Sequence, residues 1–321
     1  MKNTLVLCCF CLMLTLFSAP AHAVSLSGGN LGYTSFMDGF GEPCFLSDQY
    51  LYFYNADDYT DSAGHAKPGT NRSHNLLWLT SIKYVTDKVK ILGSWPGIDI
   101  ELPIVMDLHV KNERFTENET NVGDLFAGVF LQSPQIMLFG KYPFWQRIEF
   151  LAKFPTGHYD SKDYVNAGSN TYAINPYYAF TVMPTPKLEF SARIFYKWTA
   201  KNNDPPKTPS PKWNPKSGLP PQYADDTQEG QAVWVNYAAS HEITRNLRLG
   251  INGYYLQQIT AHEIDGHEVP NSREKVLAIG PGGMFISNNK KEICYLNFYE
   301  EVYSENRGRG LAVVLRWLHV F

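Results

Sequence analysis

The sequence predicts an all-β fold, a transmembrane antiparallel up-and-down β-barrel of about 12 strands. Three observations predict it. The chain begins with an export signal, its remainder consists of short segments that alternate apolar and polar residues, and it ends on an aromatic residue, Phe321.

Residues 1–23 have the three parts of a secretory signal peptide. Lys2 gives a positive start, Leu5 to Phe17 form an apolar run, and Ala21-His22-Ala23 is a small-x-small cleavage site. The apolar run is too short to be a membrane-spanning helix, although a retained anchor is the alternative. We therefore expect cleavage after Ala23 and a mature protein in the outer membrane of a Gram-negative cell.

Composition excludes several classes of function. Loss of Lys2 with the signal leaves 27 basic and 31 acidic residues, a net charge of 27 − 31 = −4, so no nucleic-acid partner is expected. The mature chain keeps Cys44 and Cys294, which either pair in an oxidising compartment or stay unpaired. No Cys or His spacing suits a metal, and we expect neither a metal nor a cofactor.

Alternation with a period of two is the main evidence for strands. It is clearest in four segments, Ile98–His109, Gln146–Phe154, Lys187–Trp198 and Leu247–Gln258. An Arg or Lys that faces lipid at mid-membrane costs about 2–4 kcal/mol. Arg147, Arg193 and Arg248 should therefore point into the barrel, and the aliphatic faces should meet lipid.

Loop lengths separate a barrel from a soluble β-sandwich, which would also alternate. Long and short connections take turns along the chain, as in transmembrane barrels. The long ones are expected near Asp58–Asn71, Lys111–Asn121, Thr156–Asn170, Lys201–Gln228 and Ala261–Ser272. The short ones are expected at Asp87-Lys88, Pro184–Pro186, Thr244–Asn246 and Ser287–Lys290, with Ser133–Lys141 as the weakest turn.

The last strand, Gly310 to Phe321, fixes the direction of the barrel. Trp317 and Phe321 share its apolar face and Arg316 lies on the other. A final aromatic residue after an alternating strand resembles the signature that the barrel-assembly machinery recognises, so that machinery is an expected partner, together with outer-membrane lipid. His319 departs from the signature, because an apolar or aromatic residue is usual there.

Two regions do not alternate. Residues 24–44 are rich in Gly and Ser, and we expect an irregular segment that lies in the periplasm or plugs the barrel, which itself spans 45–321. The Pro-rich stretch Lys201–Gln228 is a mobile loop or a lid. Pro103, Pro176 and Pro281 interrupt good strands, so each should sit at a bulge, which either is simply tolerated or opens a lateral path for a solute.

The inward faces supply the candidate site. Charged members either filter solutes or pair with one another in a narrow interior, and aromatic and amide members either stack on a solute or only pack. The predicted lumen- or ligand-lining residues are Arg147, Glu149, Lys153, Glu189, Arg193, Lys197, Trp234, Asn236, Arg248, Asn252, Tyr254, Tyr295, Asn297, Tyr299, Glu301 and Arg316. The same phase places Glu101, Asp107, Phe126, Phe130, Phe195 and Tyr303 inward.

Several stretches together resemble one family. They are Gly123-Asp124-Leu125, Asn175-Pro176-Tyr177-Tyr178-Ala179-Phe180-Thr181, Gly230-Gln231 with Asn236-Tyr237, Leu249 to Gln258, Ile279-Gly280-Pro281-Gly282, and Glu301 with Asn306-Arg307-Gly308. In this order they resemble the phenol meta-pathway degradation outer-membrane proteins, a family that includes sphingosine-induced outer-membrane proteins. The resemblance implies a barrel and traffic in apolar or aromatic small molecules, and it implies no catalytic residue.

The sequence therefore favours a porin-like channel or uptake barrel for small apolar, aromatic or amphipathic molecules. The alternative is a plugged barrel that binds lipid or serves at the cell surface without flux. A third, an outer-membrane hydrolase, would need Ser240-His241-Glu242 or Asp265 with His267. Ser240 and His241 fall on opposite faces of one strand, and there is no G-x-S-x-G, so we expect no enzyme.

Overall fold

The computed structural model describes residues 30–69, 71–111, 116–207 and 222–321. The expected signal peptide 1–23, its cleavage after Ala23, residues 24–29 and part of the Pro-rich loop, 208–221, lie outside the described residues. In the part of the chain that is described, no helix has the length and apolar character needed to cross a membrane.

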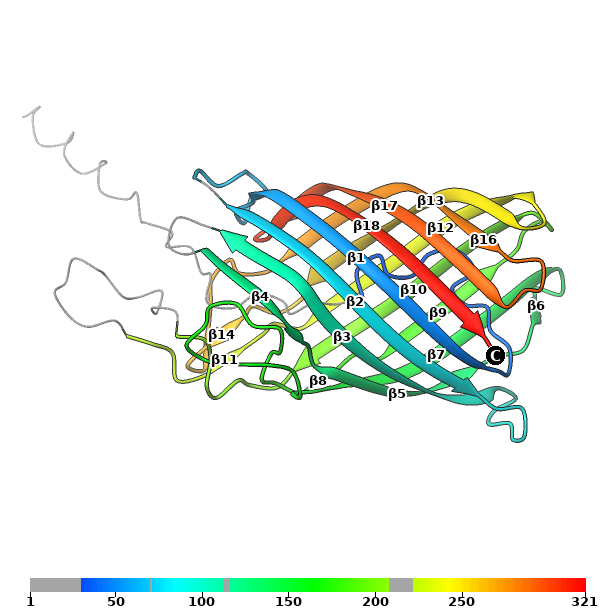
Figure 1. The fold of residues 1–321 in the computed structure, drawn as a ribbon, viewed down its shortest axis with the longest axis horizontal. Helices are drawn as coiled ribbons and strands as arrows, with labels where there is room; N and C mark the ends of the chain where they lie inside the picture. Colours follow the sequence, from blue (N-terminus) through cyan, green and yellow to red (C-terminus); the bar gives the residue numbers. More distant parts are fainter. Residues whose placement is uncertain (1–29, 70, 112–115, 208–221) are drawn as a thin grey trace, which may run out of the picture.

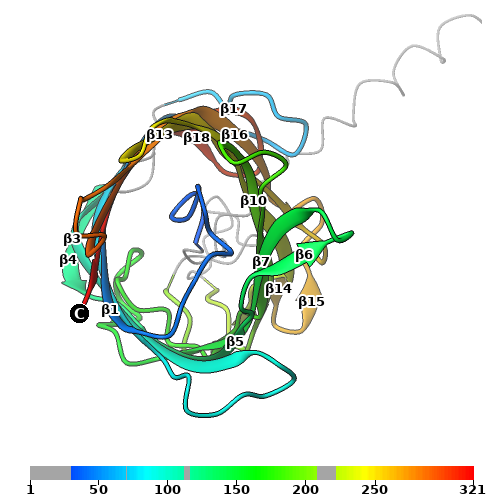
Figure 2. The same ribbon diagram turned by 90° about the vertical axis from the view of Figure 1, so that its right-hand side faces the viewer.

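Twelve strands of the described chain form a closed antiparallel barrel (Figures 1 and 2), which confirms the predicted architecture. Strands that follow one another in the wall are paired with each other, and β18 pairs with β1 to close the cylinder. The wall strands are β1 (Phe45–Tyr59), β2 (Arg72–Val85), β3 (Trp95–Lys111), β5 (Leu125–Gln132), β7 (Tyr142–Phe154), β9 (Tyr177–Val182), β10 (Leu188–Thr199), β12 (Ala232–Thr244), β13 (Leu247–Gln258), β16 (Lys275–Ile286), β17 (Glu292–Glu305) and β18 (Gly308–Val320).

Six shorter elements extend or cap this wall. The elements are β4 (Thr116–Val122), β6 (Ile136–Leu138), β8 (Ala173–Ile174), β11 (Thr227–Gln228), β14 (Glu263–Ile264) and β15 (His267–Glu268). β4 lengthens the wall beside β3, β8 continues the line of β9 between β7 and β10, and β6 folds back on β7 within the doubtful turn 133–141. β11, β14 and β15 form a small separate sheet in the loops.

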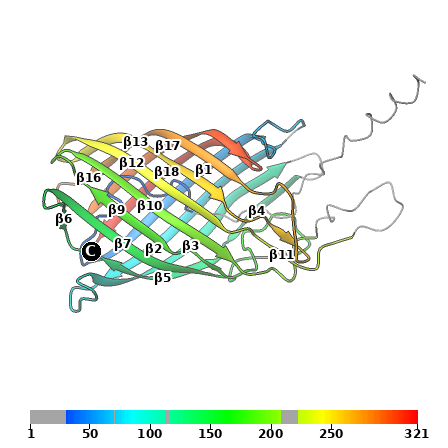
Figure 3. The same cartoon turned by 180° about the vertical axis from the view of Figure 1, so that it is seen from behind.

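The connections differ in length at the two ends of the barrel. The long loops gather at the end that carries β4 and β11, while β6 and the C-terminus lie at the opposite end (Figures 1 and 3). Transmembrane barrels have short periplasmic turns and longer external loops. We therefore assign the short-turn end, where β18 ends, to the periplasm.

The outer surface has the composition that lipid demands. Aliphatic side chains such as Ile148, Ile194, Ile251, Leu311 and Leu315 are exposed along the middle of the wall. Exposed aromatic residues follow at both ends: Phe45, Tyr84, Trp317 and Phe321 at the short-turn end, and Phe154, Tyr172, Trp198 and Tyr303 at the long-loop end. An apolar band between two aromatic girdles is typical of barrels that span a membrane.

Two bulges correct the predicted faces. In β3 the register against β2 shifts between Asp107 and Val105, and the extra residue turns Asp107 outward to His74. In β17 it shifts between Glu301 and Tyr303, and Tyr303 is exposed. The predictions that Asp107 and Tyr303 face inward, and that Leu108 faces lipid, were therefore wrong, because a bulge inverts every side chain beyond it.

The prolines behave in three different ways. Pro176 lies at the break between β8 and β9, and Pro103 lies three residues before the bulged Met106. Pro281 was expected at a bulge and has none: the register against β17 is the same at Ile279 and Gly282. Asn252 explains this, because its Nδ2 donates to Gly280 O (3.0 Å) and Phe298 O (3.3 Å) and replaces the donor that proline lacks.

The chain before β1 runs inside the barrel. Residues 30–40, which we call the lumen segment, cross the interior, where Tyr33 packs on Tyr52 of β1 and Gly39 bonds to Thr181 of β9 on the other half of the wall (Figure 2). Phe36 is fully buried against Ala238, Met284 and Tyr295. The core of this protein is thus the barrel interior, with the lumen segment at its centre.

Candidate functional site

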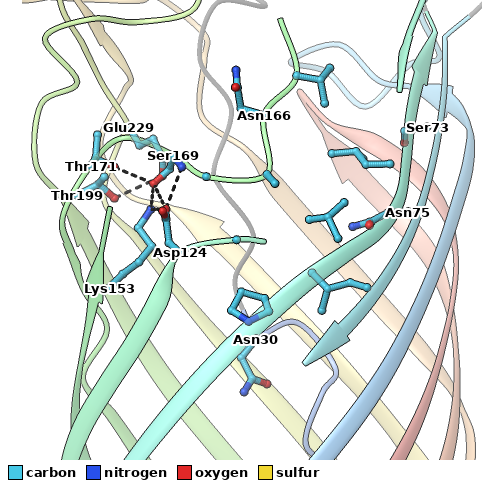
Figure 4. A pocket seen from close by; sticks show the side chains of 18 of the residues that line it. Asn30, Ser73, Asn75, Asp124, Lys153, Asn166, Ser169, Thr171, Thr199 and Glu229 are labelled. Carbon is cyan, nitrogen blue, oxygen red and sulfur yellow. Dashed lines mark hydrogen bonds and ion pairs between the residues drawn. The ribbon is translucent and has the colours of Figure 1, made fainter. Parts of the chain in front are cut away.

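A cavity of about 630 Å³ lies in the long-loop half of the barrel, above the lumen segment. Its walls come from β2, β3, β5, β7, β9, β10 and β12, its floor includes Asn30 and Tyr33, and the loop 159–171 covers part of it. Volumes of about 300–1,000 Å³ are usual for small-molecule sites. Figure 4 shows that its two sides differ in chemistry.

One side of the cavity is largely apolar, although Ser73 and Asn75 of β2 also lie on it (Figure 4). It is formed by Leu77 and Leu79 of β2 and by Val105, Leu108 and Val110 of β3. The bulge at Met106 creates this side, because it turns Leu108 and Val110 into the lumen after Val105. Burying the hydrocarbon of a solute against this side would stabilise the complex by about 25 cal/mol per Å² of apolar surface removed from water.

The opposite side is polar and internally paired. Asp124 accepts hydrogen bonds from Gly157 N (3.0 Å), Ser169 N (2.9 Å) and Ser169 Oγ (2.6 Å). Lys153 Nζ lies 3.6 Å from Asp124 and also contacts Ser169 Oγ. Lys197 pairs with Glu229 at 2.5 Å, so the two lysines face two carboxylates and this side has no net charge.

The floor is aromatic. Phe195 stacks on Trp234 with ring centroids 4.6 Å apart, and Tyr177 packs on Phe195 at 5.2 Å. Trp234 Nε1 donates to Asn30 O (3.3 Å), which ties this floor to the lumen segment. A flat solute can stack on such rings.

The external loops hold the roof through neutral hydrogen bonds. Tyr159 donates to Asp204 O (2.6 Å) and accepts from Asn202 Nδ2 (3.0 Å). Partial burial raises the pKa of the Tyr159 phenol to about 12. The phenol therefore stays protonated at physiological pH and keeps its role as a donor.

An ion pair anchors the lumen segment below the cavity. Asp38 Oδ1 and Oδ2 accept from Arg193 Nη2 (2.5 Å) and Nε (2.8 Å), and both side chains are buried. Arg193 also lies 4.2 Å from the centroid of the Tyr177 ring. This bidentate pair joins the segment to β10, 155 residues further along the chain.

Hydrogen bonds to several strands complete the docking. Asn236 Oδ1 accepts from Gly32 N (3.0 Å), Thr181 Oγ1 accepts from Gly39 N (2.9 Å), and Tyr299 donates to Gly32 O (2.7 Å). A Cβ on Gly32, whose φ is +73°, would come 2.8 Å from the Tyr299 ring, and one on Gly39 would come 2.4 Å from the Phe180 backbone. Glycine is thus required where the segment passes closest to the wall.

All sixteen predicted lumen residues are buried in the structure, but they fall into two groups. Only Lys153, Arg193 and Trp234 line the cavity; of the additional inward residues, Glu101, Phe126 and Phe195 do so. Most of the others contact the lumen segment or pair within the wall. Examples are Arg316 with Asp48 (2.6 Å), Arg147 with Gln132 (2.9 Å), and Glu301, which accepts from Tyr54 and Tyr254.

Several residues of the site were not predicted. Asp124 lies between β4 and β5 and meets Ser169 from a loop, and neither position belongs to an alternating segment. Asp38 and Tyr33 belong to the irregular segment. Asp48 and Lys83 face inward, and the alternation of Asp48 with Tyr50, Tyr52 and Tyr54 was a signal that could have found the first of them.

The residues weighed for hydrolysis are dispersed. Ser240 is buried and donates to Glu189 (2.7 Å), whereas the adjacent His241 is exposed on the other face. Asp265, in the β14–β15 turn, accepts from the backbone of Asp225 and Asp226. In the described part of the chain no group of three His, Cys, Asp or Glu side chains is arranged to hold a metal ion.

Comparisons with known proteins show which family and which solved structures this barrel is similar to. The family described as "Putative MetA-pathway of phenol degradation" matches residues 56–317. A search of the curated proteins found no match. Among solved structures, the COG4313 outer membrane channel from Pseudomonas putida F1 is similar with a TM-score of 0.71 at 14% identity, over 88% of this chain and 97% of that chain.

Two further barrels are more distant. The translocator domain of the autotransporter NalP from Neisseria meningitidis has a TM-score of 0.49 at 10% identity, over 89% of this chain and 91% of that chain. The toluene transporter TodX from Pseudomonas putida has a TM-score of 0.44 at 7% identity, over 94% and 96%. Of the three structures named, the Pseudomonas putida F1 channel supports the shared fold. Because the family match spans most of the sequence, this outer-membrane-type barrel belongs to the family described as "Putative MetA-pathway of phenol degradation".

Proposed function

We propose that this outer-membrane barrel is a channel or uptake protein for small apolar or aromatic molecules. The observation that carries the proposal is the cavity of about 630 Å³, with an apolar side from β2 and β3 above an aromatic floor. The cavity lies at the long-loop end, which we assign to the cell exterior. A solute that leaves the medium would therefore reach it first.

The polar side sets a limit on the solutes. On this side Lys153 and Lys197 are paired with Asp124 and Glu229, so it offers hydrogen bonds without net charge. Burying an unpaired charge there would cost several kcal/mol. The site therefore suits neutral molecules, either apolar or with a single polar end.

A second candidate function is solute binding without flux. The lumen segment favours it, because its ion pair and hydrogen bonds connect it to β9, β10, β12 and β17 below the cavity. In that case the solute would be held above the segment. We expect no catalysis in either case, since Ser240 and His241 point to opposite faces of β12.

Ligand binding tests both candidates first. Leu108 lines the cavity, so Leu108→Gln should weaken the binding of a small aromatic such as naphthalene, whereas Leu108→Met, which stays apolar, should not. Binding is read from the rise in the unfolding midpoint of the detergent-solubilised protein, which at 100 times Kd corresponds to about 2.7 kcal/mol. No stabilisation of the unaltered protein, or equal stabilisation of both variants, would contradict a solute site in this cavity.

Conductance across a planar bilayer then separates the two candidates. A channel should conduct ions, and its current should increase in the Asp38→Asn variant, in which the ion pair that docks the lumen segment is removed. A barrel that only binds solutes should also be stabilised by naphthalene, but it should carry no current in either the unaltered or the Asp38→Asn form.

A further inference from the structure

Polar side chains gather on the lipid-facing side of the wall at the short-turn end, where apolar residues are expected. They surround a groove of about 340 Å³ that lies across β1, β17 and β18. Its lining residues are Ser47, Gln49, Glu292, Trp317, His319 and Phe321. The groove lies outside the barrel and has no part in the lumen site.

Glu292 is the centre of the groove. Its Oε2 accepts from Trp317 Nε1 at 2.6 Å, and its Oε1 lies 2.6 Å from His319 Nδ1. Glu292 is about one-third exposed, and among the described residues its ion-pair partner is His319, with no Lys or Arg within ion-pair distance. The carboxylate is therefore fixed in position and still has lone pairs for a further donor.

The other side of the groove is also held in place. Gln49 Oε1 accepts from Trp78 Nε1 (2.9 Å) and Thr80 Oγ1 (2.8 Å), and Gln49 Nε2 donates to Ser47 Oγ (2.8 Å). These contacts join β1 to β2 and orient the amide before any ligand arrives. Preorganised side chains lose little entropy on binding.

The groove combines groups that suit two opposite charges. Glu292 together with the exposed indole of Trp317 can take an ammonium group, by hydrogen bonding and by cation–π attraction. His319 uses Nδ1 for Glu292, which leaves Nε2 to face a second partner, and Lys291 is exposed in the adjoining turn. The Lys291 ammonium, and Nε2 of His319 when the imidazole is protonated, can donate to a phosphodiester beside the bound ammonium group.

The position of the groove across the membrane indicates which kind of molecule it can bind. Phe45 and Phe321, whose ring centroids are 5.0 Å apart, belong to the aromatic girdle at this end of the barrel. Leu296 and Leu315, which are paired and exposed, continue the same face towards mid-membrane. A molecule seated here has its head at the interface and hydrocarbon along the wall, as a phospholipid does.

We propose that this groove binds the headgroup of a phosphatidylethanolamine from the periplasmic leaflet, with its ammonium on Glu292 and Trp317 and its phosphate near His319 and Lys291. Phosphatidylglycerol lacks the ammonium. Phosphatidylcholine carries a trimethylated nitrogen, which cannot donate a hydrogen bond to the carboxylate. The proposal also explains why a histidine stands at position 319, where the assembly signature usually has an apolar residue.

Native mass spectrometry of the full protein, released from nanodiscs of equal phosphatidylethanolamine, phosphatidylcholine and phosphatidylglycerol, tests the proposal. The unaltered protein should retain phosphatidylethanolamine about tenfold over the other two, as loss of one charge-assisted hydrogen bond predicts. Glu292→Gln should abolish the preference. Glu300→Gln is the matched control, since Glu300 is an exposed outward carboxylate on the same strand but outside the groove.

Two results would overturn the proposal: equal retention of the three lipids by the unaltered protein, or an equal loss of preference in the Glu300→Gln and Glu292→Gln variants. His319→Phe gives a second measurement that does not depend on the carboxylate. It restores the usual residue of the assembly signature and should fold, and it should retain less phosphatidylethanolamine than the unaltered protein. Unchanged retention by that variant would contradict the assigned phosphate contact.

Discussion

The ion pair between Asp38 and Arg193 should control whether the lumen segment stays docked. Asp38→Asn keeps the shape of the side chain and removes its charge, which leaves Arg193 buried without its bidentate partner. Removing one member of a buried pair costs about 3–5 kcal/mol. The cost should fall on docking of the segment, because residues 30–40 belong to no strand of the wall.

The lower figure, about 3 kcal/mol, already predicts a large change. Every 1.36 kcal/mol is a factor of ten, so the undocked population should rise by about two orders of magnitude. Thiol labelling measures that population. With Cys44 and Cys294 replaced by Ser, a cysteine introduced by Ser35→Cys, at a buried position of the segment, should be modified about 100 times faster in the Asp38→Asn protein.

Asp48→Asn is the matched control for this experiment. Asp48 makes a comparable buried pair with Arg316, but both residues belong to the wall. This variant should weaken the barrel without exposing residue 35 selectively. Less than a threefold change for Asp38→Asn, or equal acceleration by Asp48→Asn, would refute the reasoning.

Three further predictions concern the wall and one external loop. Ile251→Arg, on the exposed aliphatic face, should lower the free energy of unfolding in lipid vesicles by about 2–4 kcal/mol. Ile243→Arg, near the short-turn end, should lower it by only about 0–1 kcal/mol. Urea unfolding measures both values, and equal midpoints for the two variants would show that this face does not meet lipid. Asn252→Ala should cost about 1–3 kcal/mol, and Pro281→Ala should recover part of it in the double variant by giving β16 an N–H opposite Phe298; strictly additive costs would exclude that coupling. Asp61 accepts hydrogen bonds from the backbone amides of His65 and Ala63, and these lower the pKa of its carboxyl. Its turn should therefore be stable above about pH 4 and open as the pH falls through the lowered pKa. An NMR titration midpoint for Asp61 at or above the ordinary Asp value would contradict this.

The wall of the barrel could be predicted because lipid restricts each strand to one phase. Arg147, Arg193 and Arg248 could only face inward, and the residues two apart from them followed. For this reason all sixteen predicted lumen residues are buried. The prediction failed where the period breaks: the bulge expected at Pro103 changes the face of Asp107 only because it lies at Met106, and the bulge before Tyr303 has no proline to mark it.

The cavity was harder to predict than the wall. Its polar side depends on Asp124 meeting Ser169, and its lower boundary depends on Asp38 meeting Arg193. These contacts join irregular segments to distant strands, and no periodicity constrains where an irregular segment runs. The apolar side was missed because the bulge expected at Pro103 lies three residues later, at Met106, and turns Leu108 inward.

The proposed function predicts that solutes pass through the cavity and then past the lumen segment. The most direct test is the rate at which Gram-negative cells that carry the protein take up a radiolabelled small aromatic, compared among the unaltered, Leu108→Gln and Asp38→Asn forms at equal amounts of folded barrel. Uptake should be slower with Leu108→Gln, whose cavity wall is more polar, and faster with Asp38→Asn, whose lumen segment is released. Equal uptake by all three forms, no faster than by cells that lack the protein, would contradict a transport role.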